Sequence, residues 1–194
     1  MREALADYPP CVPPLWDADV KSLKEANDEY TSYFNQNRSR RVDALRNLLA
    51  KFDIALSLED DGVKAVSAWL PLYGDLLVDG LQHQEDDVFW YAYYGFQAPW
   101  VDSLIGLNPI FDLGVYMGEC MLHRNARLKL WPSVNPEPCR GGAAHPIFGQ
   151  RRGRCFDPVD WAYTECKNTH SARITKRTPD PSVLFRVMQA QSTA

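Results

Sequence analysis

The sequence lacks any uninterrupted apolar run approaching the ~20 residues that a helix needs to cross a bilayer, so no membrane-spanning helix is predicted. Residues 1–7 contain acidic side chains and no apolar stretch follows them, which excludes the pattern of a secretory signal. Cysteine is sparse, and 5 is an odd number, whereas secreted disulfide frameworks are usually even and denser. We therefore expect reduced thiols and a cytoplasmic location.

Sequence motifs that identify a type of enzyme are also missing. The chain has no Gly-x-Ser-x-Gly elbow, no phosphate-binding loop and no dinucleotide fingerprint. The sequence therefore predicts no catalytic residue and no cofactor. It favours a non-enzymatic function without deciding the point.

A chain of 194 residues with ordinary hydrophobic content can bury a core without disulfides or metal. We predict one domain over residues 1–194 in three parts. Prolines exclude a helix over 1–16 and favour an extended arm on the surface. Residues 17–125 form the helical part, and 126–194 hold a hairpin, a helix and a basic tail.

Apolar residues recur at steps of three and four along the helical part, which is typical of amphipathic helices. A first helix is predicted to start near Asp17 or Asp19, and residues 35–37 weaken its pattern before a second helix. A further helix is expected to end at Pro71, because proline cannot continue the hydrogen-bond ladder.

The clearest element is the helix predicted from about Pro109 to Arg124, with Asn108 as its N-cap. Gly114 and Gly118 lie four residues apart on it. Glycine costs a helix roughly 1 kcal/mol per residue, so we expect close approach of another backbone to this face. Asp112 and Glu119 share the same helix, and the favoured interpretation is a buried carboxylate held by a neighbouring arginine.

In the C-terminal third, residues 128–131 and 145–148 alternate in hydrophobicity and are predicted to be strands. The fold class that follows is mainly α within α+β: a helical bundle with a small antiparallel β-hairpin in the C-terminal third.

Charge is divided unevenly along the chain. Residues 1–120 carry 9 Lys and Arg against 20 Asp and Glu, a net charge of −11, while residues 121–194 carry 12 against 5, a net charge of +7. Either the two parts attract each other within the fold, or one face is displayed to an oppositely charged partner.

Acidic residues in 75–87 stand beside an aromatic cluster in 89–96, a combination that suits a protein interface with steering charges and aromatic anchors. The predicted partner-binding residues are Asp75, Asp79, Glu85, Asp86, Asp87, Trp90, Tyr91 and Tyr94. The partner they predict is a basic protein domain.

Three other interpretations stay open. Cys139, Cys155, Cys166 and His170 are zinc-ligand types, but their spacing matches no zinc motif, so no metal is predicted. A small enzyme could use Cys120, Glu119 or His123 near the glycine helix, although a packed thiol is the favoured interpretation of Cys120.

A nucleic-acid binder could use the basic C-terminal residues Arg151, Arg152, Arg154, Arg173, Lys176 and Arg177. The acidic balance of the whole chain argues against this third interpretation.

Residues 108–120 read Asn-Pro-Ile-Phe-Asp-Leu-Gly-Val-Tyr-Met-Gly-Glu-Cys and precede the strand predicted over 128–131. A glycine-containing helix with a Gly-Glu pair, followed by a short hairpin, resembles a pattern in small uncharacterised bacterial proteins. Some of these resemble immunity proteins, which neutralise a toxin made by the same cell. The resemblance covers only part of the chain and carries over no catalytic residue. It implies a protein that binds its partner stoichiometrically.

Overall fold

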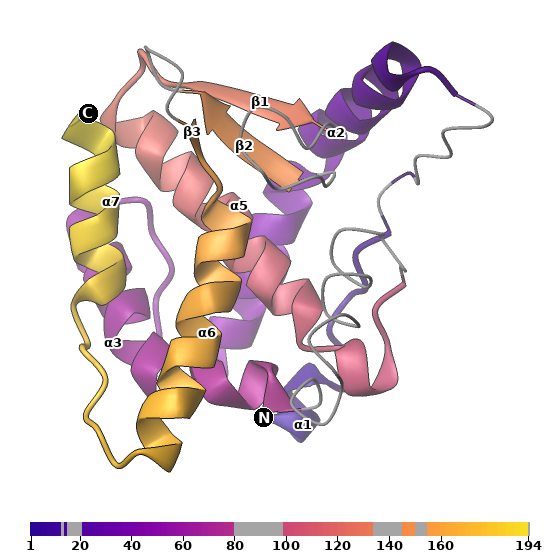
Figure 1. Cartoon of the computed structure of the whole chain (residues 1–194). Helices are drawn as coiled ribbons and strands as arrows, with labels where there is room; N and C mark the ends of the chain where they lie inside the picture. Colours follow the sequence, from indigo (N-terminus) through magenta and orange to yellow (C-terminus); the bar gives the residue numbers. More distant parts are fainter. Residues whose placement is uncertain (13, 15–20, 80–98, 134–144, 150–154, 194) are drawn as a thin grey trace.

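Six α-helices dominate the described residues, which are 1–12, 14, 21–79, 99–133, 145–149 and 155–193 of the computed structural model. The helices are α1 (Arg2–Leu5), α2 (Leu23–Ala50), α3 (Asp60–Leu77), α5 (Leu107–Arg124), α6 (Pro158–Ile174) and α7 (Val183–Thr193), and a 3-10 turn, η2 (Asp102–Leu104), precedes α5. Helix α5 crosses the middle of the molecule, with α2 and α6 on either side of it (Figure 1). The prediction of a mainly helical protein is confirmed.

The N-terminal arm is anchored more deeply than the sequence predicted. One helical turn, α1, forms before the first prolines, Pro9 and Pro10, and ends at Leu5, so neither proline lies within it. Leu5, Tyr8 and Cys11 are buried in the core. The prediction of a non-helical arm over 1–16 that lies on the surface is therefore wrong for this part.

Helix α2 is one continuous element where two helices were predicted. Ser22 and Glu25 form a reciprocal capping box at its start, while Asp17 and Asp19 lie outside the described residues. The polar residues 35–37 do not interrupt it, and the Asn37 side-chain amide donates to the Tyr33 carbonyl oxygen at 2.8 Å within the helix. Buried residues lie on α2 both before and after this stretch, so the apolar face of the helix is continuous.

Helix α3 also runs further than predicted, through Pro71 to Leu77. A proline inside a helix removes one hydrogen bond and costs about 3 kcal/mol. Leu70 and Leu77, which flank the proline, are both buried, and their transfer from water offsets that cost. Tertiary packing therefore overrides the local stop signal.

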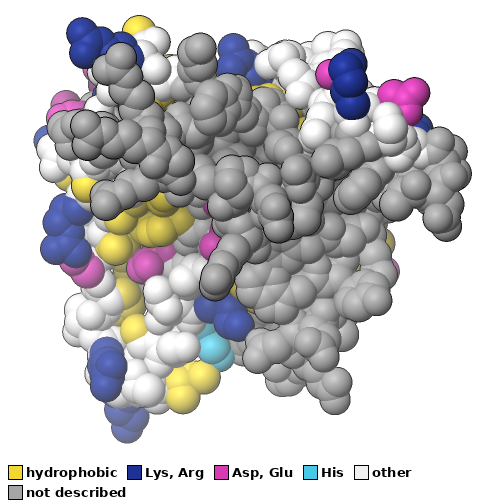
Figure 2. Space-filling model, turned by 45° about the horizontal axis from the view of Figure 1, so that its top comes forward, with side chains coloured by type: hydrophobic (Ala, Val, Ile, Leu, Met, Phe, Trp, Pro, Cys, Tyr) yellow, Lys and Arg dark blue, Asp and Glu magenta, His cyan; other side chains and the backbone are white. Residues whose placement is uncertain are grey.

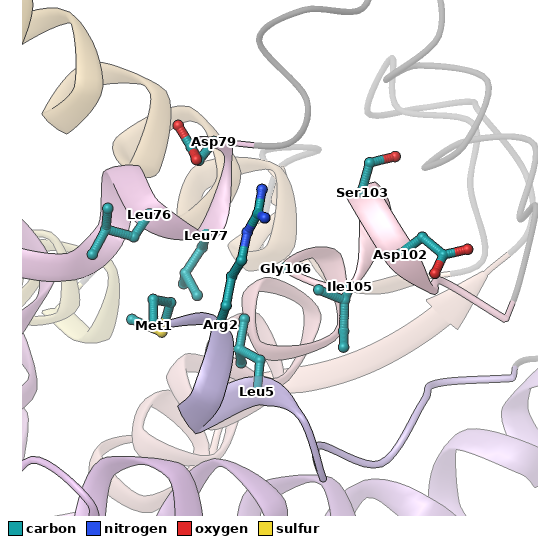
Figure 3. Close-up of a pocket in the computed structure, with 10 residues that line it drawn as sticks. All are labelled: Met1, Arg2, Leu5, Leu76, Leu77, Asp79, Asp102, Ser103, Ile105 and Gly106. Carbon is teal, nitrogen blue, oxygen red and sulfur yellow. The ribbon is translucent and has the colours of Figure 1, made fainter.

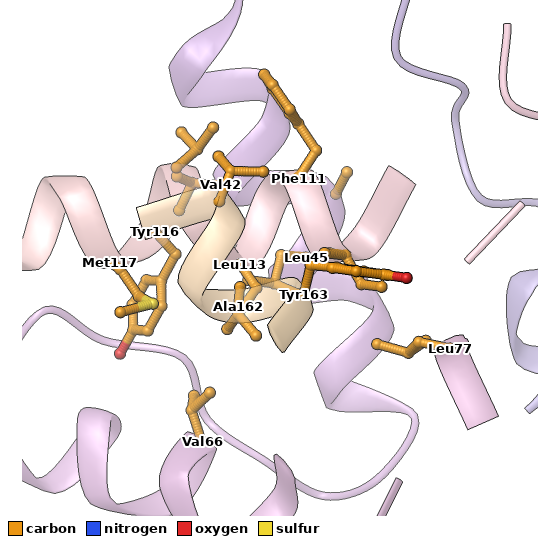
Figure 4. Close-up of a cluster of buried hydrophobic side chains, with 14 of the residues drawn as sticks. Val42, Leu45, Val66, Leu77, Phe111, Leu113, Tyr116, Met117, Ala162 and Tyr163 are labelled. Atoms are coloured by element: carbon orange, nitrogen blue, oxygen red, sulfur yellow. The ribbon is translucent and has the colours of Figure 1, made fainter. Parts of the chain in front are cut away.

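Helix α5 forms the centre of the core. It is buried continuously from Leu107 through Gly118, and its side chains meet those of α2, α3 and α6 in the cluster that Figure 4 shows. Asn108 was predicted to cap this helix, but α5 begins at Leu107 and Asn108 lies inside its first turn. The Asn108 amide instead binds the Cys11 N–H at 2.7 Å and the Trp100 carbonyl oxygen at 2.8 Å.

The predicted reason for a glycine on α5 is confirmed at Gly114. A Cβ atom there would lie 2.4 Å from Cγ2 and 2.6 Å from Cα of Val159, so the α6 backbone approaches α5 too closely for any side chain. Asp157 caps α6: Oδ1 accepts from the N–H groups of Val159 and Asp160 at 3.0 Å each.

Three short strands lie beside α2 and α5 (Figure 1). Strand β1 (Lys129–Ser133) pairs antiparallel with β2 (His145–Gly149), which pairs antiparallel with β3 (Cys155–Phe156). Only the backbone is described in β1 and β2, and the connection over 134–144 lies outside the described residues. The complete hairpin, with its turn and its side-chain contacts, therefore stays a prediction.

Replacing Gly114 with Ala tests this packing. We expect the free energy of unfolding to fall by roughly 1–3 kcal/mol, because the new methyl group forces α5 and α6 apart. Urea unfolding followed by circular dichroism measures the change. Ser39→Ala, on the exposed face of α2, is the control and should shift stability by less than about 0.5 kcal/mol. An unchanged stability of Gly114→Ala would contradict the close contact.

Candidate functional site

A buried ion pair lies between α2 and α5. Nε and Nη2 of Arg41 donate to the two carboxylate oxygens of Asp112 at 2.6 and 2.8 Å. Tyr8 from the N-terminal arm donates its hydroxyl to Asp112 Oδ2 at 2.5 Å. The prediction that a neighbouring arginine holds a buried carboxylate on this helix is confirmed.

The same arginine also fastens the arm. Its Nη1 donates to the backbone carbonyl oxygens of Pro9 and Pro10 at 3.0 Å each, and Asn108 receives the Cys11 N–H next to them. Proline leaves these carbonyls free of local helix bonding, so the guanidinium satisfies them. Five hydrogen bonds thus tie Arg41 and Asp112 to one another and to the arm.

Burial raises the pKa of Asp112 to about 6, and the opposing attraction of Arg41 and the bond from Tyr8 keep it from rising further. The carboxylate is therefore ionised at neutral pH, and the pKa of Arg41 is raised by Asp112 against the effect of burial. Asp112 is 0% exposed, so no substrate reaches it from solvent. The pair acts as a structural anchor.

Removing the arginine tests this role. Arg41→Met is expected to lower the free energy of unfolding by roughly 3–5 kcal/mol at pH 8, because an ionised Asp112 is left buried without its counter-charge. Without Arg41 the folded-state pKa of Asp112 rises above about 6, so the folded protein binds this proton more tightly than the unfolded chain. The loss should therefore be smaller at pH 5 than at pH 8.

Urea unfolding at the two pH values measures both effects. Arg46→Met is the matched control: Arg46 lies on the same helix, in an exposed pair with Asp43, and its loss should cost at most about 1 kcal/mol at either pH. An equal loss at both pH values for Arg41→Met would show that Asp112 does not titrate as described.

The described thiols of Cys11, Cys120 and Cys166 are all buried and free of disulfides. Burial raises the pKa of Cys11 and of Cys120 to about 12 and raises that of Cys166 as well. A protonated thiol inside the core is a poor nucleophile. The packed thiol predicted for Cys120 is confirmed.

Thiol reactivity offers a direct measurement. In the folded protein Cys11 and Cys120 should react with iodoacetamide about a thousandfold more slowly than in urea, because a pKa raised from 9.0 to about 12 reduces the thiolate population by that factor. Peptide mass spectrometry after timed labelling assigns each rate. Rapid labelling of Cys120 in the folded protein would show that its thiol is reactive and would support the interpretation as a small enzyme.

The other residues of the enzyme interpretation have ordinary partners. Glu119 lies 3.3 Å from Arg38, and burial raises the pKa of its carboxyl group against the attraction of that arginine. His123 Nε2 lies 3.0 Å from a carboxylate oxygen of Glu59 on the surface. These contacts join α5 to its neighbours.

A cleft of about 600 Å³ opens between α1, the C-terminal end of α3 and the turn η2. Its floor is apolar and is formed by Leu5, Leu77 and Ile105, while its rim carries Asp79, Asp102 and Arg2. Figure 3 shows the Arg2 side chain rising through the cleft, with Asp79 on one side of it and Ser103 and Asp102 on the other. The volume falls within the range of about 300–1,000 Å³ that is typical of ligand pockets.

Gly106 allows the two walls of this cleft to approach each other. A Cβ atom at Gly106 would lie 1.8 Å from the carbonyl oxygen of Leu77, so only glycine fits where the start of α5 crosses the end of α3. Asp102 adopts a left-handed backbone with φ of 50°, which aspartate and asparagine tolerate better than most residues. Sequence reasoning identified neither position, because neither glycine nor aspartate in a loop signals a site.

The structure places the predicted partner-binding residues in different settings. Asp75 is 3% exposed and its Oδ2 lies 2.7 Å from Nη1 of Arg173, so it is buried in an internal ion pair and not displayed. Asp75 lies within α3 on the side that contacts α6, so it adds no exposed charge to the surface, and its part in an interface stays a prediction. Asp79 is exposed on the rim of the cleft. The remaining predicted residues, Glu85, Asp86, Asp87, Trp90, Tyr91 and Tyr94, lie outside the described residues.

Part of the uneven charge is paired inside the fold. Arg173 meets Asp75, and Arg124 meets Asp60 at 2.6 Å, so basic residues of the C-terminal part contact acidic residues of the N-terminal part. Figure 2 shows acidic and basic side chains next to one another at the edges of the face it displays. In the described part of the chain, however, neither the Asp79 nor the Asp102 carboxylate forms a hydrogen bond or an ion pair.

The zinc and nucleic-acid interpretations depend largely on residues that are not described. Among the described side chains, no group of three or more His, Cys, Asp or Glu residues could hold a metal ion, and the side chains of Cys139 and Cys155 lie outside them. Arg173, Lys176 and Arg177 are exposed near the end of α6, whereas Arg151, Arg152 and Arg154 lie outside the described residues. Within the described ranges, none of the helices is long and apolar enough to cross a membrane.

Comparisons with known proteins add no assignment: no family model, curated protein or solved structure matches this chain. The cleft and the buried ion pair are therefore interpreted from their own geometry.

Proposed function

We propose that this protein binds a basic protein partner through the acidic rim of the cleft between α1, α3 and η2. The observation that carries the proposal is the pair of exposed carboxylates, Asp79 and Asp102, that line a cleft with an apolar floor and form no ion pair within 4.0 Å among the described residues. Asp79 is one of the residues from which the interface was predicted, and Asp102 follows the aromatic cluster 89–96 by six positions.

The two features of the cleft serve different steps of association. Unpaired surface carboxylates attract a positively charged partner over roughly a Debye length, ~8 Å at physiological salt, and so speed the encounter. The apolar floor around Leu77 and Ile105 supplies area that leaves water when the partner seats. Fast encounter and tight seating are what a protein needs to neutralise a toxin before it acts.

The specific form of this proposal is an immunity protein that acts in the cytoplasm against a toxin made by the same cell. It is supported by the resemblance of residues 108–120 and the strand after them to the small bacterial proteins described above. Such an inhibitor needs a rigid binding surface and no catalytic group, which agrees with a cleft fixed on the Arg41–Asp112 anchor.

Co-expression with the toxin candidate encoded beside this gene tests the proposal. The expected result is protection of growth and a complex that purifies as one peak in size-exclusion chromatography. Asp79→Asn and Asp102→Asn should each weaken the complex by roughly threefold to fivefold, as loss of one exposed charge contact does. Asparagine preserves the left-handed backbone at position 102.

Asp61→Asn is the matched control, because Asp61 is fully exposed at the opposite end of α3 and should leave affinity unchanged. Isothermal titration calorimetry gives the affinities. Absence of both protection and complex would overturn the immunity function. Equal weakening of the complex by all three variants would show that the cleft does not take part in binding.

A further inference from the structure

We infer that the cleft receives an arginine or lysine side chain of the partner, and that Arg2 of this chain occupies the same place in the free protein. The inference rests on the proposed function, because it specifies what the acidic rim recognises. It commits to a single occupant, a basic side chain with an aliphatic stem.

The position of Arg2 supplies the first argument. Arg2 extends from α1 across the cleft towards Asp79, so a long cationic side chain is sterically accommodated there (Figure 3). Its guanidinium nevertheless makes no ion pair within 4.0 Å to a described carboxylate, and the residue is exposed. A side chain that enters from outside can therefore displace Arg2 at small cost, since no hydrogen bond has to break.

Charge and shape supply the second argument. The carboxylates of Asp79 and Asp102 on the rim attract a cationic group. Leu5, Leu77 and Ile105 line the floor, and the methylene stem of arginine or lysine covers such apolar surface while its charged end stays at the rim. A compact inorganic cation would leave that floor exposed to water, so it is a poorer fit.

The rigidity of the cleft supplies the third argument. The Gly106 backbone crosses Leu77 too closely for any side chain, so the α3 and η2 walls are held at one separation. The α1 wall is held through Tyr8 and Cys11, which bond Asp112 and Asn108 on α5. The two carboxylates are thus preorganised, and little order has to be created when a cation enters.

Titration with N-acetyl-arginine amide, followed by amide chemical shifts in nuclear magnetic resonance, tests the inference without the protein partner. The expected shifts are at Ser103, Ile105 and Gly106, and N-acetyl-glutamine amide, which lacks the charge, should leave these signals in place. Asp79→Asn and Asp102→Asn should each weaken binding by roughly threefold to fivefold, and Asp61→Asn should not.

Arg2→Gln gives the decisive result, because it keeps a long side chain but removes the competing charge. Binding of the arginine probe should strengthen by roughly threefold to fivefold in this variant. The Leu5 amide signal reports whether α1 stays folded, and Arg46→Gln, which removes one exposed positive charge from α2, is the control for the change in net charge. Unchanged or weaker binding in Arg2→Gln with α1 intact would overturn the inference.

The outcome is separable from that of the proposed function. Binding of the probe at the cleft without a complex with the toxin candidate would preserve this inference and overturn the immunity function. A complex that forms although the probe produces no shifts at the cleft would overturn this inference and leave the binding function standing.

Discussion

The ion pair between Arg41 and Asp112 joins three parts of the chain that are far apart in sequence: the N-terminal arm, α2 and α5. An ionised carboxylate that is fully buried requires both a counter-charge and hydrogen bonds, and here the guanidinium supplies two bonds while Tyr8 supplies a third. Because the remaining guanidinium donor is directed at the carbonyls of Pro9 and Pro10, the same group also fixes the arm. The ion pair therefore specifies one arrangement of these segments, because displacement of any of them would leave a buried charge without its partner.

The position of the cleft depends on this anchor. Helix α1 is a single turn and is far too short to be stable alone. It is held in place by the buried residues Leu5, Tyr8 and Cys11 that follow within the same arm. With α1 fixed, Arg2 extends over the cleft, and the crossing at Gly106 sets the distance to the opposite wall. The acidic rim is therefore a consequence of core packing and not of a local sequence motif.

The functional proposal combines this geometry with the charge distribution of the chain. The uneven charge along the sequence admitted two interpretations, and the structure shows ion pairs that fit the first of them, attraction within the fold. Arg173 and Arg124 pair with acidic residues of the first 120 positions, which accounts for internal attraction. Asp79 and Asp102 have no such partner in the described part of the chain and face outward. Steering of a basic protein by these two carboxylates stays a proposal, as does the identity of the partner.

The sequence by itself determined the mainly helical class, the close contact at Gly114 and the arginine-held carboxylate on α5. Each of these follows from local periodicity, from the preference of a residue for one backbone position, or from the high cost of burying an isolated charge. Only the tertiary structure decided that α2 and α3 continue through residues 35–37 and Pro71, because burial of distant apolar side chains outweighs a local break of a few kcal/mol. It also decided that Asp75 is buried while Asp79 is displayed, although both are aspartates on one acidic stretch. Asp75 lies on the side of α3 that faces α6, whereas Asp79 lies beyond the end of the helix, and no pattern within the stretch encodes that difference.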